Sequence, residues 1–240
     1  MRAMILAAGR GERMRPLTDG CPKPLLRVGG RPLIEWQLLA LRRAGIVDVV
    51  INHAHLGSML EAALGDGARW GLRIRYSPEG EALETAGGVA HALPLLGDGP
   101  FLVTAGDVFT DFDPARALTI APQMQAAGLA AWCVMIDNPP HHSDGDFALR
   151  DGRLLADGAP RLTFSGIGVY RAALFDGIAP GTKAPLAPLL RDAAQRGLAG
   201  AEYFGGRWTD VGTPQRLAEL DAQLAQQAQQ AQQRERRAGA

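Results

Sequence analysis

The sequence is poor in cysteine and has no excess of charge of either sign. Its two cysteines, Cys21 and Cys133, lie far apart among 240 residues. A small secreted domain held together by disulfides carries more cysteines at closer spacing, so such a framework is excluded. The 25 lysines and arginines equal the 25 aspartates and glutamates. Without a basic excess there is no charge signature for a nucleic-acid partner, and any phosphate binding must come from a local arrangement of residues.

Long apolar runs are also absent. No run approaches the roughly 20 residues that a membrane-spanning helix needs, which argues against a membrane partner. The chain begins with a strand-like apolar run at 3–7 that is too short for the core of a signal peptide, and no cleavage pattern follows it. We therefore expect a cytoplasmic protein. Apolar residues make up 47% of the chain, enough for the buried core of one sizeable domain.

Short apolar segments alternate with amphipathic ones, in βαβα order through the first half of the chain. This order predicts an α/β fold: a Rossmann-like mixed, mainly parallel sheet with helices on both faces. The expected strands are 3–7, 47–52, 72–76, 101–105, 130–136, 146–149 and 163–170. The expected helices are 33–44, 56–64, 85–96, 185–197 and a last one that starts at Pro214.

The chain is expected to form one domain over residues 1–221. Residues 222–240 form a Gln/Ala-rich C-terminal extension or tail, interpreted as a solvated helix without an assigned role. No hexapeptide repeat follows the first domain, so a fused β-helix is not expected. The sequence gives no indication of the oligomeric state.

A glycine- and arginine-rich loop directly follows the first expected strand. In an open parallel sheet, ligands bind beyond the carboxyl ends of the strands. Gly9 and Gly11 allow the backbone to approach a ligand closely. Arg13 and Arg15 add positive charge, and Lys23 adds another between two prolines. This combination suits a triphosphate.

Two familiar phosphate-binding motifs do not match this loop. A Walker loop ends in Gly-Lys-Ser/Thr, which is missing. A dinucleotide fingerprint needs a third glycine where this chain has Met14, which also argues against a nicotinamide oxidoreductase. A bare Gly-x-Gly is weak evidence and fits a plain basic surface loop. The pattern Gly-x-Gly-x-Arg-x-x-Pro followed by Lys-Pro is far more specific.

The loop resembles the signature of the sugar-1-phosphate nucleotidylyltransferases. Four later segments agree with that family in order and spacing: 77–88, 105–108, 164–170 and 208–213. The resemblance covers roughly residues 3–221. It implies a GT-A-like nucleotidyltransferase fold, Mg²⁺ as cofactor, and a nucleoside triphosphate and a sugar 1-phosphate as substrates.

The resemblance also implies roles for single residues. Arg13 and Lys23 match the catalytic cations, and Asp107 and Asp210 match the metal ligands. The expected nucleotide-binding residues are Leu6, Ala7, Ala8, Gly9, Gly11, Glu12, Glu79, Glu84 and Thr85. The expected sugar-binding residues are Gly145, Asp146 and Gly166. Taken alone, Asp107 fits an ordinary turn residue better, because Gly-Asp is a common turn pair, but its place directly after the apolar strand 101–105 favours the metal role. Asp210 taken alone could belong to a loop that leads into the last helix.

Two departures from the family pattern affect base recognition. Glu79 stands where many relatives carry glutamine, and Glu84 stands where many carry glycine. The Leu-Glu-Thr-Ala-Gly-Gly segment and the short chain look most like the uridylyltransferases that act on N-acetylmuramate 1-phosphate in cell-wall recycling. Mannose-1-phosphate guanylyltransferases and glucose-1-phosphate thymidylyl- or uridylyltransferases remain alternatives within the enzyme class.

A non-catalytic sugar-nucleotide-binding regulatory subunit is the alternative from another class. Such a protein is expected to lose the loop arginine, the lysine or the aspartates, and all are present here. The histidines of the pairs 53/55 and 141/142 lack the Cys/His spacing of a zinc site. Cys21 lies near Lys23, but no His or Asp partner that would activate it as a nucleophile can be identified.

Overall fold

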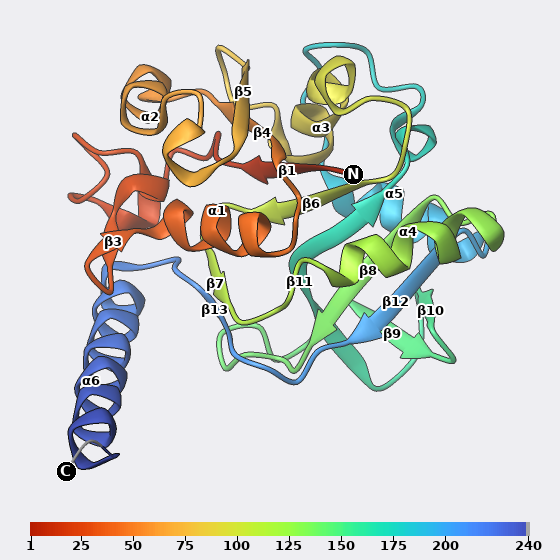
Figure 1. Ribbon diagram of the computed structural model, residues 1–240. Coiled ribbons are helices and arrows are strands. Elements are labelled where there is room, and N and C mark those ends of the chain that lie inside the picture. Colours follow the sequence, from red (N-terminus) through yellow and green to blue (C-terminus); the bar gives the residue numbers. More distant parts are fainter. Residues whose placement is uncertain (239–240) are drawn as a thin grey trace.

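The computed structural model describes residues 1–238 and is built on a nine-stranded sheet. The strands lie in the order β5-β4-β1-β6-β11-β8-β12-β10-β9 (Figure 1). Their bounds are β1 Arg2–Leu6, β4 Asp48–His53, β5 Arg73–Pro78, β6 Phe101–Ala105, β8 Ala131–Ile136, β9 Phe147–Arg150, β10 Arg153–Leu155, β11 Arg161–Tyr170 and β12 Ala199–Tyr203.

The first half of the sheet is parallel, as the βαβα order predicts. Strand β1 pairs in parallel with β4 on one side and with β6 on the other, and β4 pairs in parallel with β5. Strands β1 and β6 are buried on both faces, which explains why they form continuous apolar runs in the sequence. Because these strands are parallel, the loops that follow β1, β4 and β6 meet at one edge of the sheet.

The second half of the sheet corrects the prediction of a mainly parallel sheet. Strand β11 runs antiparallel to both β6 and β8, and β10 runs antiparallel to β9 and β12. Strand β9 also pairs with β11, so β11, β8, β12, β10 and β9 close into a five-stranded mixed ring. The alternation of strand and helix weakens after residue 130, because β8, β9, β10 and β11 follow one another without an α-helix, and strands joined in this way can pair antiparallel.

Helices cover both faces of the sheet, as expected. One core contains apolar side chains of α1 (Leu33–Arg43), α2 (Gly57–Leu64) and α4 (Arg116–Ala126). The other core contains those of α3 (Glu84–Leu96) and α5 (Leu186–Gln195). The predicted helices 33–44, 56–64, 85–96 and 185–197 match four of these, whereas α4 was not expected.

Two small ribbons and a third core hold the segments around the glycine loop. Strand β2 (Arg27–Val28) pairs with β3 (Arg31–Pro32), and β7 (Val108–Thr110) pairs antiparallel with β13 (Trp208–Asp210). Short 3-10 turns lie at η1 Glu12–Met14, η2 Lys23–Leu25, η3 Ala68–Trp70 and η4 Ala172–Phe175. The third core joins Met14 of the glycine loop to Phe109, Val211 and Leu220. It therefore ties the loop to segments nearly 200 residues away in the sequence.

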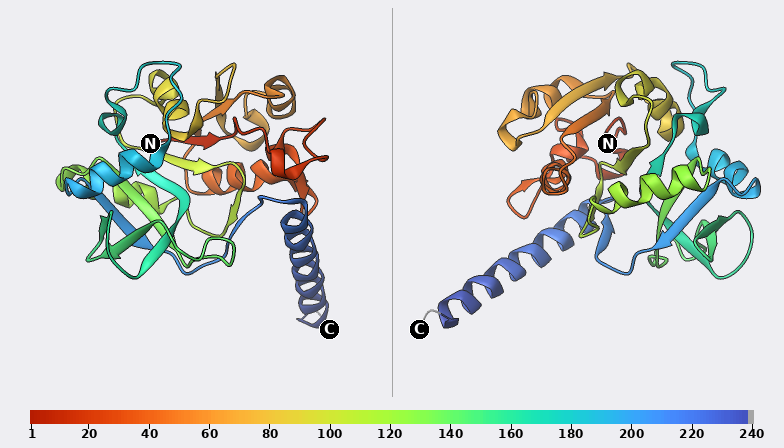
Figure 2. Two further views of the ribbon diagram at one scale, coloured as in Figure 1. Left: turned by 180° about the vertical axis from the view of Figure 1, so that it is seen from behind. Right: turned by 45° about the vertical axis from the view of Figure 1, so that its right-hand side comes forward.

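Helix α6 (Pro214–Ala238) starts against the body and then projects from it (Figures 1 and 2). Leu217, Leu220 and Leu224 pack near Trp36, whereas 225–234 are exposed. The helix passes without a break through the predicted boundary at residue 221, and residues 239–240 of the predicted extension lie outside the described residues.

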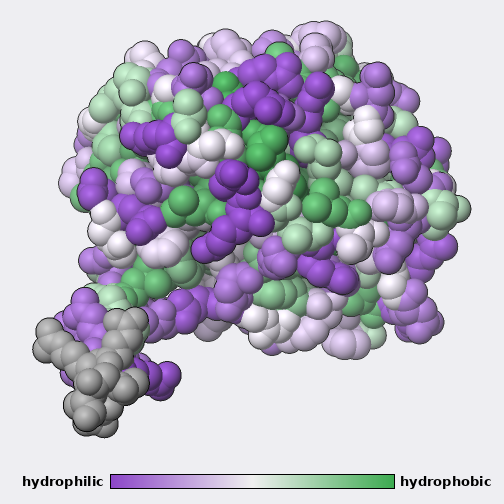
Figure 3. Space-filling view, in the orientation of Figure 1, coloured by the Kyte–Doolittle hydropathy of each residue, from purple (hydrophilic) through white to green (hydrophobic). Residues whose placement is uncertain are grey.

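On the face in Figure 3, hydrophilic and hydrophobic side chains are interspersed. Within residues 1–238, no helix combines the length and apolar character needed to cross a bilayer.

Candidate active site

A cavity of about 500 Å³ lies at the edge of the sheet where β1 and β6 end. Most residues predicted to be catalytic, to bind the nucleotide or to bind the metal line it: Leu6, Ala7, Gly9, Gly11, Glu12, Arg13, Lys23, Thr85 and Asp107. Residues from the loop after β1, the turn after β6 and the start of α3 thus converge on one space. The location agrees with the general rule that open α/β sheets bind ligands beyond the carboxyl ends of their strands.

Close backbone packing builds the floor of this cavity. The amide of Gly106 donates to the carbonyl oxygen of Leu6 at 2.8 Å, and a Cβ atom on Gly106 would lie 2.5 Å from that oxygen. Only glycine fits there. The Asn52 Oδ1 atom accepts a hydrogen bond from the Ala7 amide at 2.8 Å. The first residues of the glycine loop are therefore held by both neighbouring strands.

Lys23 reaches into the cavity from η2. Its Nζ atom lies 2.5 Å from Oδ2 of Asp107, and its side chain is only 11% exposed. Gly11 has a φ of +65°, and a Cβ atom there would lie 3.0 Å from Thr18 and 3.3 Å from Lys23. The glycine loop thus packs directly against the stem of the lysine, and the ammonium group is fixed beside the carboxylate.

The β7–β13 ribbon brings the second aspartate beside the first. Asp210 is paired with Val108, and the Val211 amide donates to the Asp107 carbonyl oxygen at 2.8 Å. The Asp210 carboxylate is held on both sides: Oδ1 lies 3.1 Å from His141 Nε2, and Oδ2 lies 2.5 Å from Arg216 Nη1. Two residues that are far apart in sequence, Asp107 and Asp210, therefore lie on adjacent backbone segments.

Gly212 lies close to Arg13, Arg216 and the carboxylate of Asp210. A Cβ atom at Gly212 would lie 3.0 Å from Arg216 Nη1, 3.1 Å from Asp210 Oδ2 and 3.5 Å from Arg13 Nη2. Gly212 itself lines the phosphate cavity. The Oδ2 atom of Asp210 therefore lies near Gly212, while Asp210 itself lines a separate hollow with His141 and Arg216.

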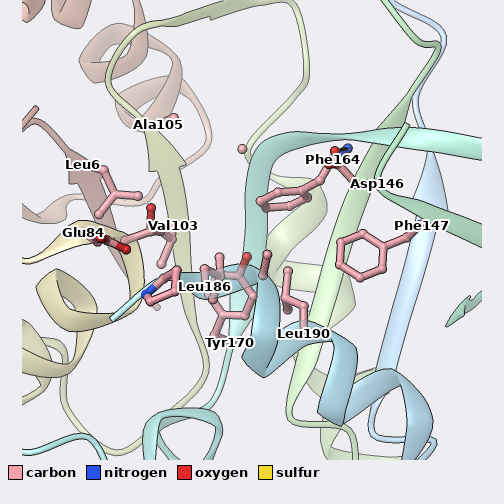
Figure 4. Close-up of a pocket in the computed structure, with 14 residues that line it drawn as sticks. Leu6, Glu84, Val103, Ala105, Asp146, Phe147, Phe164, Tyr170, Leu186 and Leu190 are labelled. Atoms are coloured by element: carbon pink, nitrogen blue, oxygen red, sulfur yellow. Dashed lines mark hydrogen bonds between the residues drawn. The ribbon is translucent and has the colours of Figure 1, made fainter. Parts of the chain in front are cut away.

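A second cavity, of about 520 Å³, adjoins the first and shares Leu6, Thr85 and Ala105 with it. Figure 4 shows Leu6, Glu84 and Val103 on one side of it and Asp146, Phe147 and Phe164 on the other, with Tyr170, Leu186 and Leu190 below. Among the predicted sugar-binding residues, Asp146 and Gly166 line this cavity. The two cavities form one cleft with a polar, cationic part and a largely apolar part.

Asp146 is fixed by its own neighbours. Its Oδ2 atom accepts a hydrogen bond from the Phe164 amide at 2.8 Å, and Oδ1 lies 3.0 Å from His142 Nε2. Gly145, just before it, has a φ of +63° and packs against Arg161 and Asn138, so a side chain there would be strained. Gly166 also has a positive φ, +77°, at an irregularity of the β11–β8 pairing.

Four of the predicted site residues line neither cavity: Ala8, Glu79, Gly145 and Asp210, the last of which lines a separate hollow of about 500 Å³. Glu79 instead supports the segment before α3. Its Oε1 atom accepts from Asn52 Nδ2 at 2.6 Å, and its Oε2 atom accepts from the Leu83 amide at 2.8 Å. Because Asn52 also holds Ala7, Glu79 is connected to the glycine loop through one side chain. A direct contact of Glu79 with a nucleotide stays a prediction.

Glu84 opens helix α3 in a left-handed conformation, with a φ of +61°. It lines the second cavity rather than the phosphate cavity. For a residue with a Cβ atom this conformation costs about 1–2 kcal/mol. Such strain at the edge of a cavity is typical of positions that serve a ligand.

The strain at Glu84 can be measured with a pair of variants. Glu84→Gly is expected to be more stable than Glu84→Ala by about 1 kcal/mol, because only glycine adopts this φ without strain. At Thr119, an exposed position inside α4, the alanine variant is expected to be the more stable one by a similar amount. Urea unfolding of the four variants makes the comparison. If the alanine variant is the more stable one at position 84 as well as at position 119, Glu84 is not strained.

Neither cysteine is suited to act as a nucleophile. Burial raises the pKa of the Cys133 thiol far above its usual value, and partial burial raises the pKa of Cys21 as well. The reactive thiolate is therefore disfavoured at both positions near neutral pH. This agrees with the absence of an activating partner in the sequence.

Sequence reasoning did not identify the side chains that support the predicted site residues. Asn52 holds the glycine loop, His142 holds Asp146, and His141 and Arg216 hold Asp210. The sequence pattern pointed to the histidines only as zinc ligands, a role that their spacing argued against. One signal was available for Arg216, since the first turn of a helix that directly follows Asp210 can face back to it.

The chain resembles known proteins along nearly all its length. Residues 2–145 match the model of the nucleotidyl transferase family. An N-acetylmuramate alpha-1-phosphate uridylyltransferase of Neisseria meningitidis is 52% identical over 226 residues, covering 92% of this chain and 97% of the relative. An enzyme of the same name from Caulobacter vibrioides is 34% identical and covers 93% of this chain and 97% of its own.

The fold itself also occurs in solved structures. A Bacillus anthracis protein described as a glucose-1-phosphate thymidylyltransferase superposes with a TM-score of 0.81. The match covers 93% of this chain and 95% of the other, at 22% sequence identity. This likeness supports the mixed α/β architecture and, at that identity, nothing beyond the architecture.

Proposed function

The chain belongs to the nucleotidyl transferase family and is a sugar-1-phosphate nucleotidyltransferase, and from this premise we propose that it transfers the uridylyl group of UTP to N-acetylmuramic acid 1-phosphate. Pyrophosphate is the second product. The observation that carries the choice of substrates is the identity with the Neisseria relative along nearly the full length of both chains. The continuous cleft, polar at one end and apolar at the other, has room for both substrates.

The residues at the polar end fit a divalent cation such as Mg²⁺. Asp107 lines the phosphate cavity, and Asp210 offers a second carboxylate from the adjacent backbone segment. Among the described residues, no three or more acidic, histidine or cysteine side chains gather as a metal cluster. That agrees with Mg²⁺, which takes one or two carboxylates and fills its other positions with waters and substrate phosphates. When bound, Mg²⁺ would offset the charge on the phosphate oxygens and orient them.

In the proposed reaction, an oxygen of the sugar phosphate attacks the α-phosphorus of UTP, and the bond to the β-phosphate bridging oxygen breaks. The attacking oxygen is already an anion, so no general base is required. The barrier comes from bringing two anions together and from the charge that develops on the leaving pyrophosphate. Positioning and fixed positive charge should therefore supply most of the catalysis.

Each part of the cleft has a proposed task in this reaction. The glycine loop places its backbone along the nucleotide, and Arg13 offsets charge on the triphosphate and the leaving pyrophosphate. Lys23 places an ammonium group next to Asp107, where the reacting phosphate would lie. Asp146 and Gly166 border the cavity proposed for the sugar. The apolar side chains of this cavity exclude water, which would otherwise compete as nucleophile.

Pyrophosphate release with Mg²⁺ tests the proposal. UTP, dTTP, GTP and CTP are each combined with the 1-phosphates of N-acetylmuramic acid, N-acetylglucosamine, glucose and mannose. Strong release is expected only for UTP with the muramyl phosphate. Release with another pair would keep the reaction and replace the substrates. No release with any pair, from a folded sample, would point to a non-catalytic sugar-nucleotide-binding protein.

A further inference from the structure

The loop between β8 and β9 carries two adjacent histidines that bind to opposite parts of the site. His142 contacts Asp146 in the sugar cavity, with 3.0 Å between Nε2 and Oδ1. His141 contacts Asp210, with 3.1 Å between Nε2 and Oδ1. The loop therefore lies between the cavity proposed for the sugar and the carboxylate proposed to hold the cation.

The loop is held in a defined shape by its own hydrogen bonds. Asn138 Nδ2 donates to the carbonyl oxygens of Ser143 and Arg161, at 3.0 Å each. Asn138 Oδ1 accepts from Thr163 Oγ1 at 2.8 Å, and the His142 amide donates to the Pro139 carbonyl oxygen at 2.8 Å. His141 is thus presented by a braced loop, although its side chain is 36% exposed.

The two oxygens of Asp210 face in different directions. Oδ2 lies next to Gly212, a residue that lines the phosphate cavity, and is bonded to Arg216. Oδ1 is bonded to His141, and Asp210, His141 and Arg216 all line a separate hollow of about 500 Å³. The imidazole therefore holds the one oxygen of the carboxylate that Arg216 does not bind.

We propose that His141 is a positioning residue that fixes the carboxylate of Asp210 for the divalent cation. The inference rests on the proposed metal role of Asp210. Carboxylates that bind metals are commonly oriented by such an outer hydrogen bond, and its loss costs about 10- to 100-fold in metal affinity or activity. The bond needs only a ring N–H that donates to Oδ1.

Binding of Mn²⁺, measured by electron paramagnetic resonance, tests this role without relying on turnover. The protein is saturated with a UTP analogue whose α,β-bridging oxygen is a methylene group. His141→Leu, which keeps the bulk and removes the donor, is expected to raise the Mn²⁺ dissociation constant about tenfold or more. His141→Gln, which keeps an N–H donor at similar reach, is expected to stay within about threefold of wild type, well below the loss that follows removal of an outer hydrogen bond.

His55→Leu is the matched control, because His55 is exposed and belongs to neither cavity. It should bind Mn²⁺ as the wild type does, and melting curves of all variants report on folding. Wild-type affinity in His141→Leu would overturn the inference, and so would an equal loss in the glutamine variant. A wild-type protein that binds no Mn²⁺ would refute the metal role of Asp210 itself, whereas pyrophosphate release tests the proposed reaction separately.

Discussion

Replacing Lys23 with alanine is expected to lower kcat about a hundred- to a thousandfold, the usual loss when one fixed donor to a developing charge is removed. The Lys23 ammonium lies 2.5 Å from Asp107, at the place where the reacting phosphate would meet the cleft. Its charge is held in position before the substrates arrive, so no reorganisation is needed during the reaction. Steady-state pyrophosphate release with both substrates saturating gives kcat directly.

Lys23→Arg is expected not to restore the rate. The lysine side chain is 11% exposed, and the Cβ position of Gly11 lies within 3.3 Å of its stem. A planar guanidinium is larger and places its charge differently from a compact ammonium. Lys183→Ala is the control, because Lys183 is exposed and pairs with Glu81. Full activity in Lys23→Arg would show that charge alone matters there, and full activity in Lys23→Ala would remove Lys23 from the mechanism.

The parallel half of the fold could be predicted from sequence because both faces of its strands are buried. Strands β1 and β6 leave continuous apolar runs, and the helices between such strands leave a period of 3.6 residues. The rule that ligands bind at the carboxyl ends of parallel strands then placed the glycine loop and Asp107 in one cavity. Local patterns were sufficient for that part of the site.

The antiparallel half could not be predicted in the same way. Strands β9 and β10 are short, and which strands they pair with depends on closure of the ring through β11, which no local pattern encodes. Helix α4 escaped notice for a related reason: only two of its four buried residues, Ile120 and Met124, are large, and Pro122 lies inside it. Prediction from periodicity fails where few large apolar residues mark the buried face.

The supporting side chains also lay beyond the reach of sequence reasoning. Asn52 and Glu79 contact each other across 27 residues, and Asn52 reaches Ala7 across 45. These bonds form because β4 lies beside β1 and its end meets the glycine loop. The residues expected to contact ligands could be matched to a family motif, but those that hold them follow only from the arrangement of the strands.

Asp107→Asn and Asp210→Asn are each expected to lower turnover by at least about a hundredfold, with little change in melting temperature. The amide keeps the size of the side chain but removes the negative charge that Mg²⁺ prefers. Because Asp107 is paired with Lys23 and Asp210 with Arg216, each substitution also frees one cation in the cleft. Both variants should therefore need more Mg²⁺ for half-maximal pyrophosphate release.

Asp48→Asn separates this effect from a general loss of charge. Asp48 forms an ion pair with Arg73, with 2.7 Å between Oδ2 and Nη2, and it lies at the opposite, amino end of β4. Its activity and Mg²⁺ requirement are expected to match those of the wild type. Near-normal turnover in one site variant would assign the cation to the other aspartate alone. Near-normal turnover in both would leave Lys23 and Arg13 as the main sources of charge stabilisation. A double variant of the two aspartates completes the series. If its turnover is no lower than that of either single variant, the two aspartates act through one bound ion.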